Sequence, residues 1–308
     1  MHRTFHIQIP ADKTQDIVSD LLKRKEVIGL STSIGGSQKP VGDVLLVQLM
    51  NRGADEVLSI VSTHCGESSY LVTTSLTEAM IEPDQAEKLE DDIDEAIWEE
   101  IETTMRHQGR LSVNFISLMG LGGIMATVGI LAESTSQIMP FVAAAVIAPG
   151  FEPIAGMSLG LVLRRWELFG KDALSSLVGY AVLMTTSALT FWLMQATGNT
   201  TVQDFADSAE VKHMAHSGLG DWLLSISGAL AGGLIISSFR KSVIAGALIA
   251  MVLIHAAAVV GVGLACGRFD LAGVGLLRFV VDIGLILVGC SFVFWIKQRF
   301  FHQRRPVA

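Results

Sequence analysis

The sequence is short of charged residues and of cysteines. Only 17% of its 308 residues are charged and 50% are hydrophobic, whereas a soluble domain has about 25% charged residues. The three cysteines, Cys65, Cys266 and Cys290, form no C-x-x-C pair. This spacing argues against structural zinc and against a disulfide framework, and favours buried thiols. We therefore expect no bound metal and no cofactor.

Two further signals are missing. The sequence has no basic groove with interleaved aromatic residues, so we expect no nucleic-acid partner. Its first residues, 1–6, are followed by polar sequence without an apolar core, so we expect no cleavable signal peptide. The net charge of −8 has a local origin, because eleven acids and a single base, Lys88, lie between Glu82 and Glu102.

Long apolar runs dominate the chain from residue 111 to residue 297. A membrane-spanning helix needs about 20 apolar residues to cross the hydrocarbon layer. We therefore predict an α-helical polytopic membrane protein with about six spans, the first of which serves as the insertion signal. The expected spans are 111–131, 138–163, 173–197, 219–238, 242–266 and 272–297.

Residues 1–80 have the composition of a small soluble α+β domain. Alternating segments predict four strands, and helical spacing of apolar residues predicts two helices between them. The resulting order, βαββαβ, is the ferredoxin-like arrangement. The expected strands are 4–9, 27–34, 43–50 and 68–75, and the expected helices are 11–25 and 52–63.

Residues 81–110 predict one acidic amphipathic helix that connects this domain to the membrane region. Pro83 suits its first turn, and apolar residues recur every four positions from Leu89 to Met105. Arg106 and Arg110 lie near its C-terminal end, where the helix dipole favours positive charge. Residues 298–308 form a basic tail.

The distribution of Lys and Arg predicts the orientation. With a cytoplasmic N-terminus, eleven basic residues flank the inner ends of the spans and only Lys212 and Arg268 lie outside. Basic residues concentrate on the cytoplasmic side of multi-pass proteins. We therefore expect a multi-pass protein of the cell (inner) membrane with both termini in the cytoplasm.

The membrane region contains an internal repeat at an offset of 103 residues. Over positions 160–192 this shift gives nine identities without gaps, among them Arg165 with Arg268 and Trp192 with Trp295. The repeats cover about 111–197 and 214–297, with three spans each, so the two halves insert in opposite directions. Inverted repeats of this kind are typical of secondary transporters. The alternative is a chance resemblance of two apolar stretches.

The strongest candidate for a functional site is Glu152, which lies between Pro149 and Pro153 in the second apolar segment. Prolines interrupt a helix, and an ionisable group at membrane depth is a functional candidate. The offset of 103 pairs Glu152 with His255, and we expect the two side chains to meet near the bilayer midplane. The alternatives are a local helix cap for Glu152 and a core histidine for His255.

Two other patterns have structural interpretations. Arg278 and Asp282 are four residues apart in the last segment and are expected to neutralise one another, with a role in the substrate pathway as the alternative. Ser158 lies in a G-x-S-x-G sequence, but a nucleophile elbow needs a strand-to-helix turn. This sequence instead suits close helix packing, so we expect no enzyme activity.

The stretch VAAAVIAPGFEPIAGMSLGLVLRRWELF at 142–169 resembles the hydrophobic membrane proteins grouped as the domain of unknown function 389 family. The resemblance covers about 111–297 and implies an apolar helix, a proline-punctuated break and a glycine-rich helix. Many members carry a second proline-rich break in the later half. Here the corresponding stretch, 253–257, has no proline. The resemblance implies an architecture and no settled activity.

Together these features predict a membrane transporter or channel-like protein for a small solute or ion. Its cytoplasmic domain would regulate transport or assemble subunits, so membrane lipids and further copies of the chain are the expected partners. The alternative is a membrane-anchored ligand sensor or scaffold that transports nothing.

Overall fold

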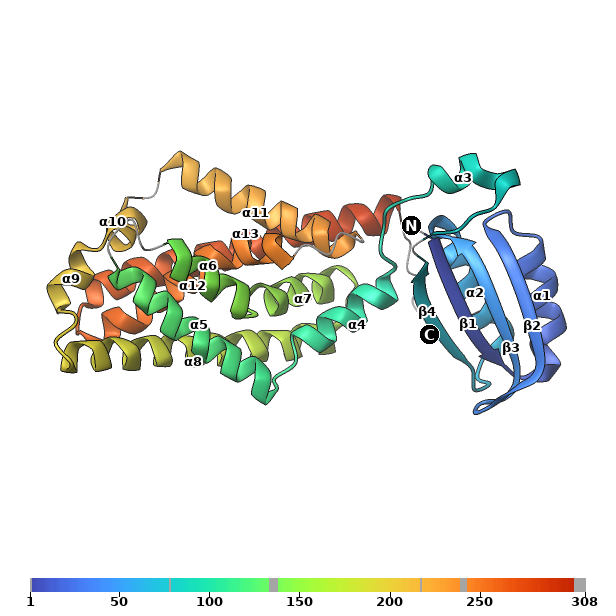
Figure 1. Ribbon diagram of the computed structural model, residues 1–308, viewed down its shortest axis with the longest axis horizontal. Coiled ribbons are helices and arrows are strands. Elements are labelled where there is room, and N and C mark those ends of the chain that lie inside the picture. The colour runs from blue at the N-terminus through green and yellow to red at the C-terminus, as the bar shows by residue number, and fades with distance from the viewer. Residues whose placement is uncertain (1, 78, 133–137, 217, 239–242, 302–308) are drawn as a thin grey trace. The chain divides into compact units, whose positions relative to one another are not determined.

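The computed structural model describes residues 2–77, 79–132, 138–216, 218–238 and 243–301 (Figure 1). The protein is mostly helical, with a small antiparallel sheet near its N-terminus. The chain divides into two compact units, Met1–Trp98 with Gln298–Ala308 and Glu99–Lys297. Each unit is described by itself below.

The first unit has the expected order of elements, β1-α1-β2-β3-α2-β4. The sheet has the order β2-β3-β1-β4, and all neighbouring strands are antiparallel. Short 3-10 turns at Ala11–Lys13 and Asn51–Gly53 lead into the two helices. The bounds are β1 His2–Ile9, α1 Thr14–Leu22, β2 Val27–Gln38, β3 Val41–Met50, α2 Ala54–Cys65 and β4 Leu71–Thr77.

Alternation along the strands creates the core of this unit. Phe5 and Ile7 of β1 are fully buried and pair with Val47 and Leu45 of β3, while His6 between them is exposed. Successive strand residues point to opposite faces of a sheet. The buried face is covered by α1 and α2, which lie on the same side of the sheet in Figure 1.

Hydrogen bonds to the Asp43 carboxylate stabilise the hairpin between β2 and β3. The Asp43 carboxylate accepts hydrogen bonds from the Gly35 backbone N–H at 2.7 Å and from the Thr14 hydroxyl at 2.7 Å. Gly35 has a φ of +65°, which favours glycine. The Gly35 N–H, followed by the Thr14 hydroxyl, lowers the pKa of Asp43. The ionised carboxylate therefore stabilises the fold.

The connection over 81–110 is not one continuous helix, so that prediction is wrong. It consists of a 3-10 turn at Pro83–Gln85, α3 Ala86–Glu90, a non-helical segment, and α4 Trp98–Gln108. Ile97 explains the interruption in part, because its side chain is fully buried in the core of the first unit. This unit therefore extends through Trp98 rather than ending near residue 80.

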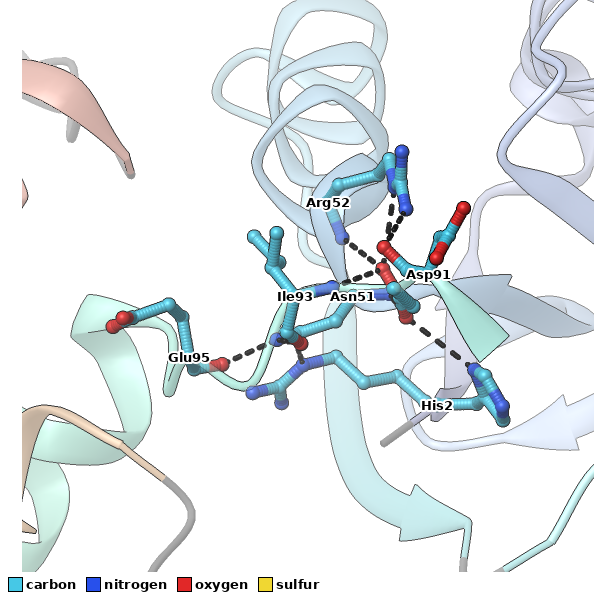
Figure 2. A network of polar contacts seen from close by, with 8 residues as sticks. His2, Asn51, Arg52, Asp91, Ile93 and Glu95 are labelled. Atoms are coloured by element: carbon cyan, nitrogen blue, oxygen red, sulfur yellow. Dashed lines mark hydrogen bonds and ion pairs between the residues drawn. The ribbon is translucent and has the colours of Figure 1, made fainter. Parts of the chain in front are cut away.

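A buried polar network holds the non-helical segment (Figure 2). Asn51 is fully buried, and its side-chain oxygen accepts a hydrogen bond from Arg3 Nε at 2.5 Å. Its amide donates to the carbonyl oxygens of Ile93, at 3.0 Å, and of Glu95. The Asp92 carboxylate accepts from the Asn51 backbone N–H at 2.6 Å. Because these bonds use backbone groups of 93–95, they replace the hydrogen bonds of a continuing helix.

The second unit is a bundle of apolar helices. Four described helices, α5, α8, α11 and α13, are long and apolar enough to cross a membrane. The pair α6 and α7 is bent by 46° at a short break and could count as a fifth span. The bounds are α5 Val113–Leu131, α6 Ile138–Ile147, α7 Phe151–Val162, α8 Trp166–Ala196, α9 Val202–Asp207, α10 Ala209–Ala215, α11 Leu219–Ser237, α12 Val243–Ala265 and α13 Phe269–Phe300.

The turns α7–α8 and α12–α13 have the same geometry at an offset of 103 residues. The Arg165 backbone N–H donates to the Gly160 carbonyl at 2.8 Å, and the Arg268 N–H donates to the Gly263 carbonyl at 2.9 Å. The helices before and after these turns also end and begin at positions 103 apart. The identities found in the sequence therefore coincide with equal local structure.

The contact between α5 and α8 also corresponds to the contact between α11 and α13. The Ser187 hydroxyl of α8 donates to the Gly123 carbonyl of α5 at 3.1 Å, and the Cys290 thiol of α13 donates to the Ala229 carbonyl of α11 at 3.5 Å. Ser187 and Cys290 are 103 residues apart, whereas Gly123 and Ala229 are 106 apart. A difference of three residues in the connection accounts for the change of offset.

The first prediction concerns the extent of the first unit. A fragment of residues 1–98 should be more stable than a fragment of residues 1–80 by about 2 kcal/mol or more, because only the longer one buries Ile97. Urea unfolding followed by circular dichroism measures the difference. In the longer fragment, Asn51→Ala should remove most of the gain. Equal stability of the two fragments would contradict the extended boundary.

The second prediction concerns acid stability. In the 1–98 fragment, Asp43→Asn should lower the free energy of unfolding at neutral pH by about 1.5–3 kcal/mol, the usual scale for hydrogen bonds to a charged group. The folded pKa lies below the unfolded value of about 3.9, so this stabilisation is lost as the pH falls through the folded pKa. The difference between variant and wild type should therefore shrink in acid. A constant difference down to the lowest pH would exclude the carboxylate as its source.

Candidate functional site

The break between α6 and α7 is the centre of the candidate site. Pro149 lies in the break and Pro153 lies in the first turn of α7. A proline has no N–H, so the carbonyl oxygens four residues earlier, those of Ala145 and Pro149, receive no helical hydrogen bond. The sequence thus places two carbonyl oxygens with free acceptor capacity inside an apolar segment.

Glycines bring the neighbouring helices close to this break. A Cβ atom on Gly150 would lie 2.6 Å from the Tyr180 hydroxyl of α8, so only glycine fits there without movement. A Cβ atom on Gly122 of α5 would lie 2.5 Å from the Cβ atom of Ala148. The Tyr180 ring packs edge-on against Phe279 of α13, with ring centroids 4.6 Å apart. Helices α5, α8 and α13 therefore enclose the break.

Glu152 is the second residue of α7, directly after Phe151, and its side chain is largely buried. The Oε2 atom is enclosed and has no hydrogen-bond partner among the residues that the structure describes. The carboxylate thus has one oxygen available for another partner.

Three further polar side chains follow one face of α8 and were not predicted. Asp172, Ser176 and Tyr180 are four residues apart and at least nine-tenths buried. Asp172 Oδ2, Ser176 Oγ and the Tyr180 hydroxyl have no hydrogen-bond partner within the described ranges. Their spacing in a largely apolar helix is a signal that could have identified them, because residues four apart share a helix face.

His255 does not form an ion pair with Glu152 in the described part of the chain, so the expected direct contact is not observed. Its Nδ1 atom lies 3.7 Å from Oε1 of Glu210 in α10, and its ring lies 3.7 Å from the ring of Phe141 in α6. Phe141 precedes the break, whereas Glu152 follows it. The helix α12 is continuous at His255 and lacks a second break, in keeping with the absence of proline at 253–257.

Arg278 and Asp282 form the expected ion pair, with Nε and Oδ2 2.9 Å apart. Both side chains are buried, and the guanidinium also donates to the Ser225 hydroxyl of α11 at 2.7 Å. Arg278 lies over the Trp222 ring, 5.0 Å from its centroid. This pair joins α13 to α11, which agrees with a structural interpretation.

A comparison with known protein families finds a match in the apolar helical unit. The model of one family, described as "Domain of unknown function (DUF389)", matches residues 145–288. Just under half of the chain is thus similar to this family. The matched range confirms the resemblance seen at 142–169. No curated protein and no solved structure matches the chain.

The range that matches the DUF389 family model contains all six residues that the sequence predicts for a site: Pro149, Glu152, Pro153, His255, Arg278 and Asp282. The structure gathers the first three at the break and gives His255 and the Arg278–Asp282 pair separate surroundings. The range also includes Asp172, Ser176 and Tyr180. Its functional candidates therefore concentrate on α7 and the facing side of α8.

The serine of the G-x-S-x-G sequence lies inside helix α7. Ser158 is fully buried, and its hydroxyl lies 3.2 Å from the carbonyl oxygen of Ile154 and 3.4 Å from that of Leu287 in α13. A hydroxyl engaged by helix carbonyls links two helices. Within the described ranges, no group of three His, Cys, Asp or Glu side chains could hold a metal ion.

The third prediction tests the packing at the break. Gly150→Ala should destabilise the full-length protein by about 1–3 kcal/mol, because its Cβ atom would overlap the Tyr180 hydroxyl. Adding Tyr180→Phe should restore part of the loss. Thermal unfolding in detergent measures both, with Gly170→Ala as the control, since a Cβ atom there meets nothing within 4 Å. If the double variant is no more stable than Gly150→Ala, the contact is not the cause.

Proposed function

We propose that the protein is a membrane transporter or channel-like protein that moves a small solute or cation. Its site for the transported species or for a coupling cation lies at the α6–α7 break. Glu152 is the group that binds and releases the cation, and Tyr180 is its neighbour across the helix interface. The ligands offered are a carboxylate, a phenol and backbone carbonyls, all of them oxygen donors that suit protons and hard cations.

The observation that carries this proposal is the enclosed, unpartnered Oε2 atom of Glu152 beside the broken helix. Burying a carboxylate oxygen without a partner is costly, and membrane proteins keep such groups where they serve a pathway. Transporter sites are formed at interrupted helices, because the ends of the half-helices and freed carbonyls offer partial charges to an ion.

The proposed arrangement in the membrane has six spans, with the broken pair α6–α7 as the second and α12 as the fifth. The equal turns at Gly160–Arg165 and Gly263–Arg268 support a 3+3 inverted repeat. The excess of Lys and Arg beside the inner ends of the spans supports cytoplasmic termini in a cell membrane. On this topology the turn between α7 and α8 faces the cytoplasm.

For the N-terminal unit we propose a regulatory or assembly role in the cytoplasm. Its βαββαβ order and the strand order β2-β3-β1-β4 support a ferredoxin-like classification. Both outer strands, β2 and β4, pair on one side only in the described chain and leave backbone groups for a partner strand. Homo-oligomers are the corresponding expectation.

The fourth prediction tests transport itself. Proteoliposomes containing the full-length protein and an internal pH-sensitive or Na⁺-sensitive dye should show cation uptake when a K⁺ gradient and valinomycin impose a membrane potential. Glu152→Gln should lower this flux by about 100-fold or more, because proton-binding groups contribute on that scale. Glu167→Gln is the matched control, since Glu167 is exposed and pairs with Lys171 at 2.6 Å.

Two results would contradict the proposal. Flux through the wild-type protein that equals the flux of protein-free liposomes, with folding verified, would favour the sensor or scaffold alternative. Flux that persists in Glu152→Gln at the wild-type rate would remove Glu152 from the pathway.

A further inference from the structure

We propose that Asp172, Ser176 and Tyr180 form a proton path along the α7–α8 interface, from the turn at the start of α8 to Glu152. This inference rests on the proposed function of Glu152 and adds the route and the nature of the coupling ion. It follows from buried polar atoms on one helix face that the protein does not use for its own hydrogen bonds.

The three side chains lie in a line that leads to the break. Asp172 is six residues from Trp166, the first residue of α8, and Tyr180 contacts Gly150 at the break. Because an α-helix rises about 1.5 Å per residue, neighbouring members are about 6 Å apart along α8. The line therefore extends from the end of the helix into its apolar interior.

The facing helix leaves room for these side chains. A Cβ atom on Gly156 of α7 would lie 2.0 Å from Asp172 Oδ2, and one on Gly150 would lie 2.6 Å from the Tyr180 hydroxyl. Asp172 thus faces Gly156 and Tyr180 faces Gly150. At both glycines the polar atom approaches the backbone directly. Substitution of either glycine would fill the space that the polar atoms occupy.

The atoms themselves point to a hydrated route. Asp172 Oδ2, Ser176 Oγ, the Tyr180 hydroxyl and Glu152 Oε2 are enclosed and lack hydrogen-bond partners in the described part of the chain. Buried polar groups in native proteins are satisfied by protein or by ordered water. One water between two such groups spans about 5.5–6 Å, a length similar to the helix rise of about 6 Å between residues four apart. Side chains and single waters can therefore alternate.

The surroundings of the polar line differ between its Asp172 end and its Tyr180 end. The Arg106 guanidinium of α4 acts on Asp172, and Gly109 packs against Asp172 Oδ1. At the other end the Tyr180 hydroxyl lies against Gly150, two residues before Glu152. Asp172 is thus placed to take up a proton near the end of the helix, and Glu152 is placed to receive it at the break.

The proton transfer is balanced without a redox step. A proton bound by the Asp172 carboxylate passes to a water, which gives a different proton to the next group. The Ser176 and Tyr180 hydroxyls each accept one proton and donate one, so their protonation is unchanged. The Glu152 carboxylate ends as the neutral acid, and Asp172 returns to its ionised form.

The test follows the Glu152 carboxyl directly in the full-length protein in lipid nanodiscs. Infrared difference spectra between acid and neutral pH contain a carboxylic-acid band that Glu152→Gln removes, and transfer into D₂O gives the rate at which this group exchanges its proton. Ser176→Ala, Tyr180→Phe and Asp172→Asn should each slow the exchange by about tenfold or more. Ser187→Ala is the control, because this buried hydroxyl of α8 is bonded to Gly123.

The outcomes separate this path from the proposed transport. Slower exchange in the three variants supports the path even if proteoliposomes show no cation uptake, a result that would refute transport alone. Exchange at the wild-type rate in all three variants would overturn the path while leaving Glu152 as a transport site. The absence of a Glu152 band at every pH where the protein stays folded would also overturn it.

Discussion

The structure of the apolar helical unit depends on one constraint, the loss of two backbone N–H donors at Pro149 and Pro153. Inside a bilayer each backbone polar group needs a partner within the protein. A helix that meets two prolines so close together cannot supply those partners for its own carbonyls. The observed result is a 46° bend between α6 and α7.

Close packing around the bend follows from this constraint. Gly122 of α5 admits Ala148, and Gly150 admits the Tyr180 hydroxyl. The second contact places the Tyr180 phenol beside Gly150, two residues before Glu152 in the chain. The corresponding helix of the second half, α12, has no proline at the equivalent place and is continuous. The turns α7–α8 and α12–α13 thus have corresponding hydrogen bonds, whereas the helices before them differ, because only the first contains a break.

Local patterns allowed much of the fold to be predicted. Alternation identified the four strands, because one face of the sheet is buried and the other is not. Hydropathy located the apolar helices, and Pro149 and Pro153 located the break. The proline-free stretch around His255 correctly raised doubt about a second break. In each case the deciding information lies within about ten neighbouring residues.

The errors arose where distant residues decide the structure. The helix expected over 81–110 is interrupted because Asn51, in another part of the chain, binds the carbonyls of Ile93 and Glu95. The Glu152–His255 contact was inferred from equivalent positions in a repeat, but His255 faces Glu210 instead. Equivalence in a repeat fixes the position along a helix, not the partner that a side chain meets.

Tyr180 escaped prediction for a related reason. Nothing in the segment 173–197 shows which face of its helix will pack against the break. A periodic polar pattern was present in Asp172, Ser176 and Tyr180, but its meaning depends on the glycines of α7 that lie opposite. Those glycines are recognisable as close-packing residues only when the two helices are seen together.

A high-resolution cryo-electron microscopy map of the protein in lipid nanodiscs tests the central claim most directly. We expect ordered density for water or a cation beside Glu152 Oε2, within hydrogen-bonding or coordination distance of the Tyr180 hydroxyl or of the freed carbonyls of Ala145 and Pro149. A map in which Glu152 faces lipid, or in which Oε2 is bonded to a protein donor, would contradict the account.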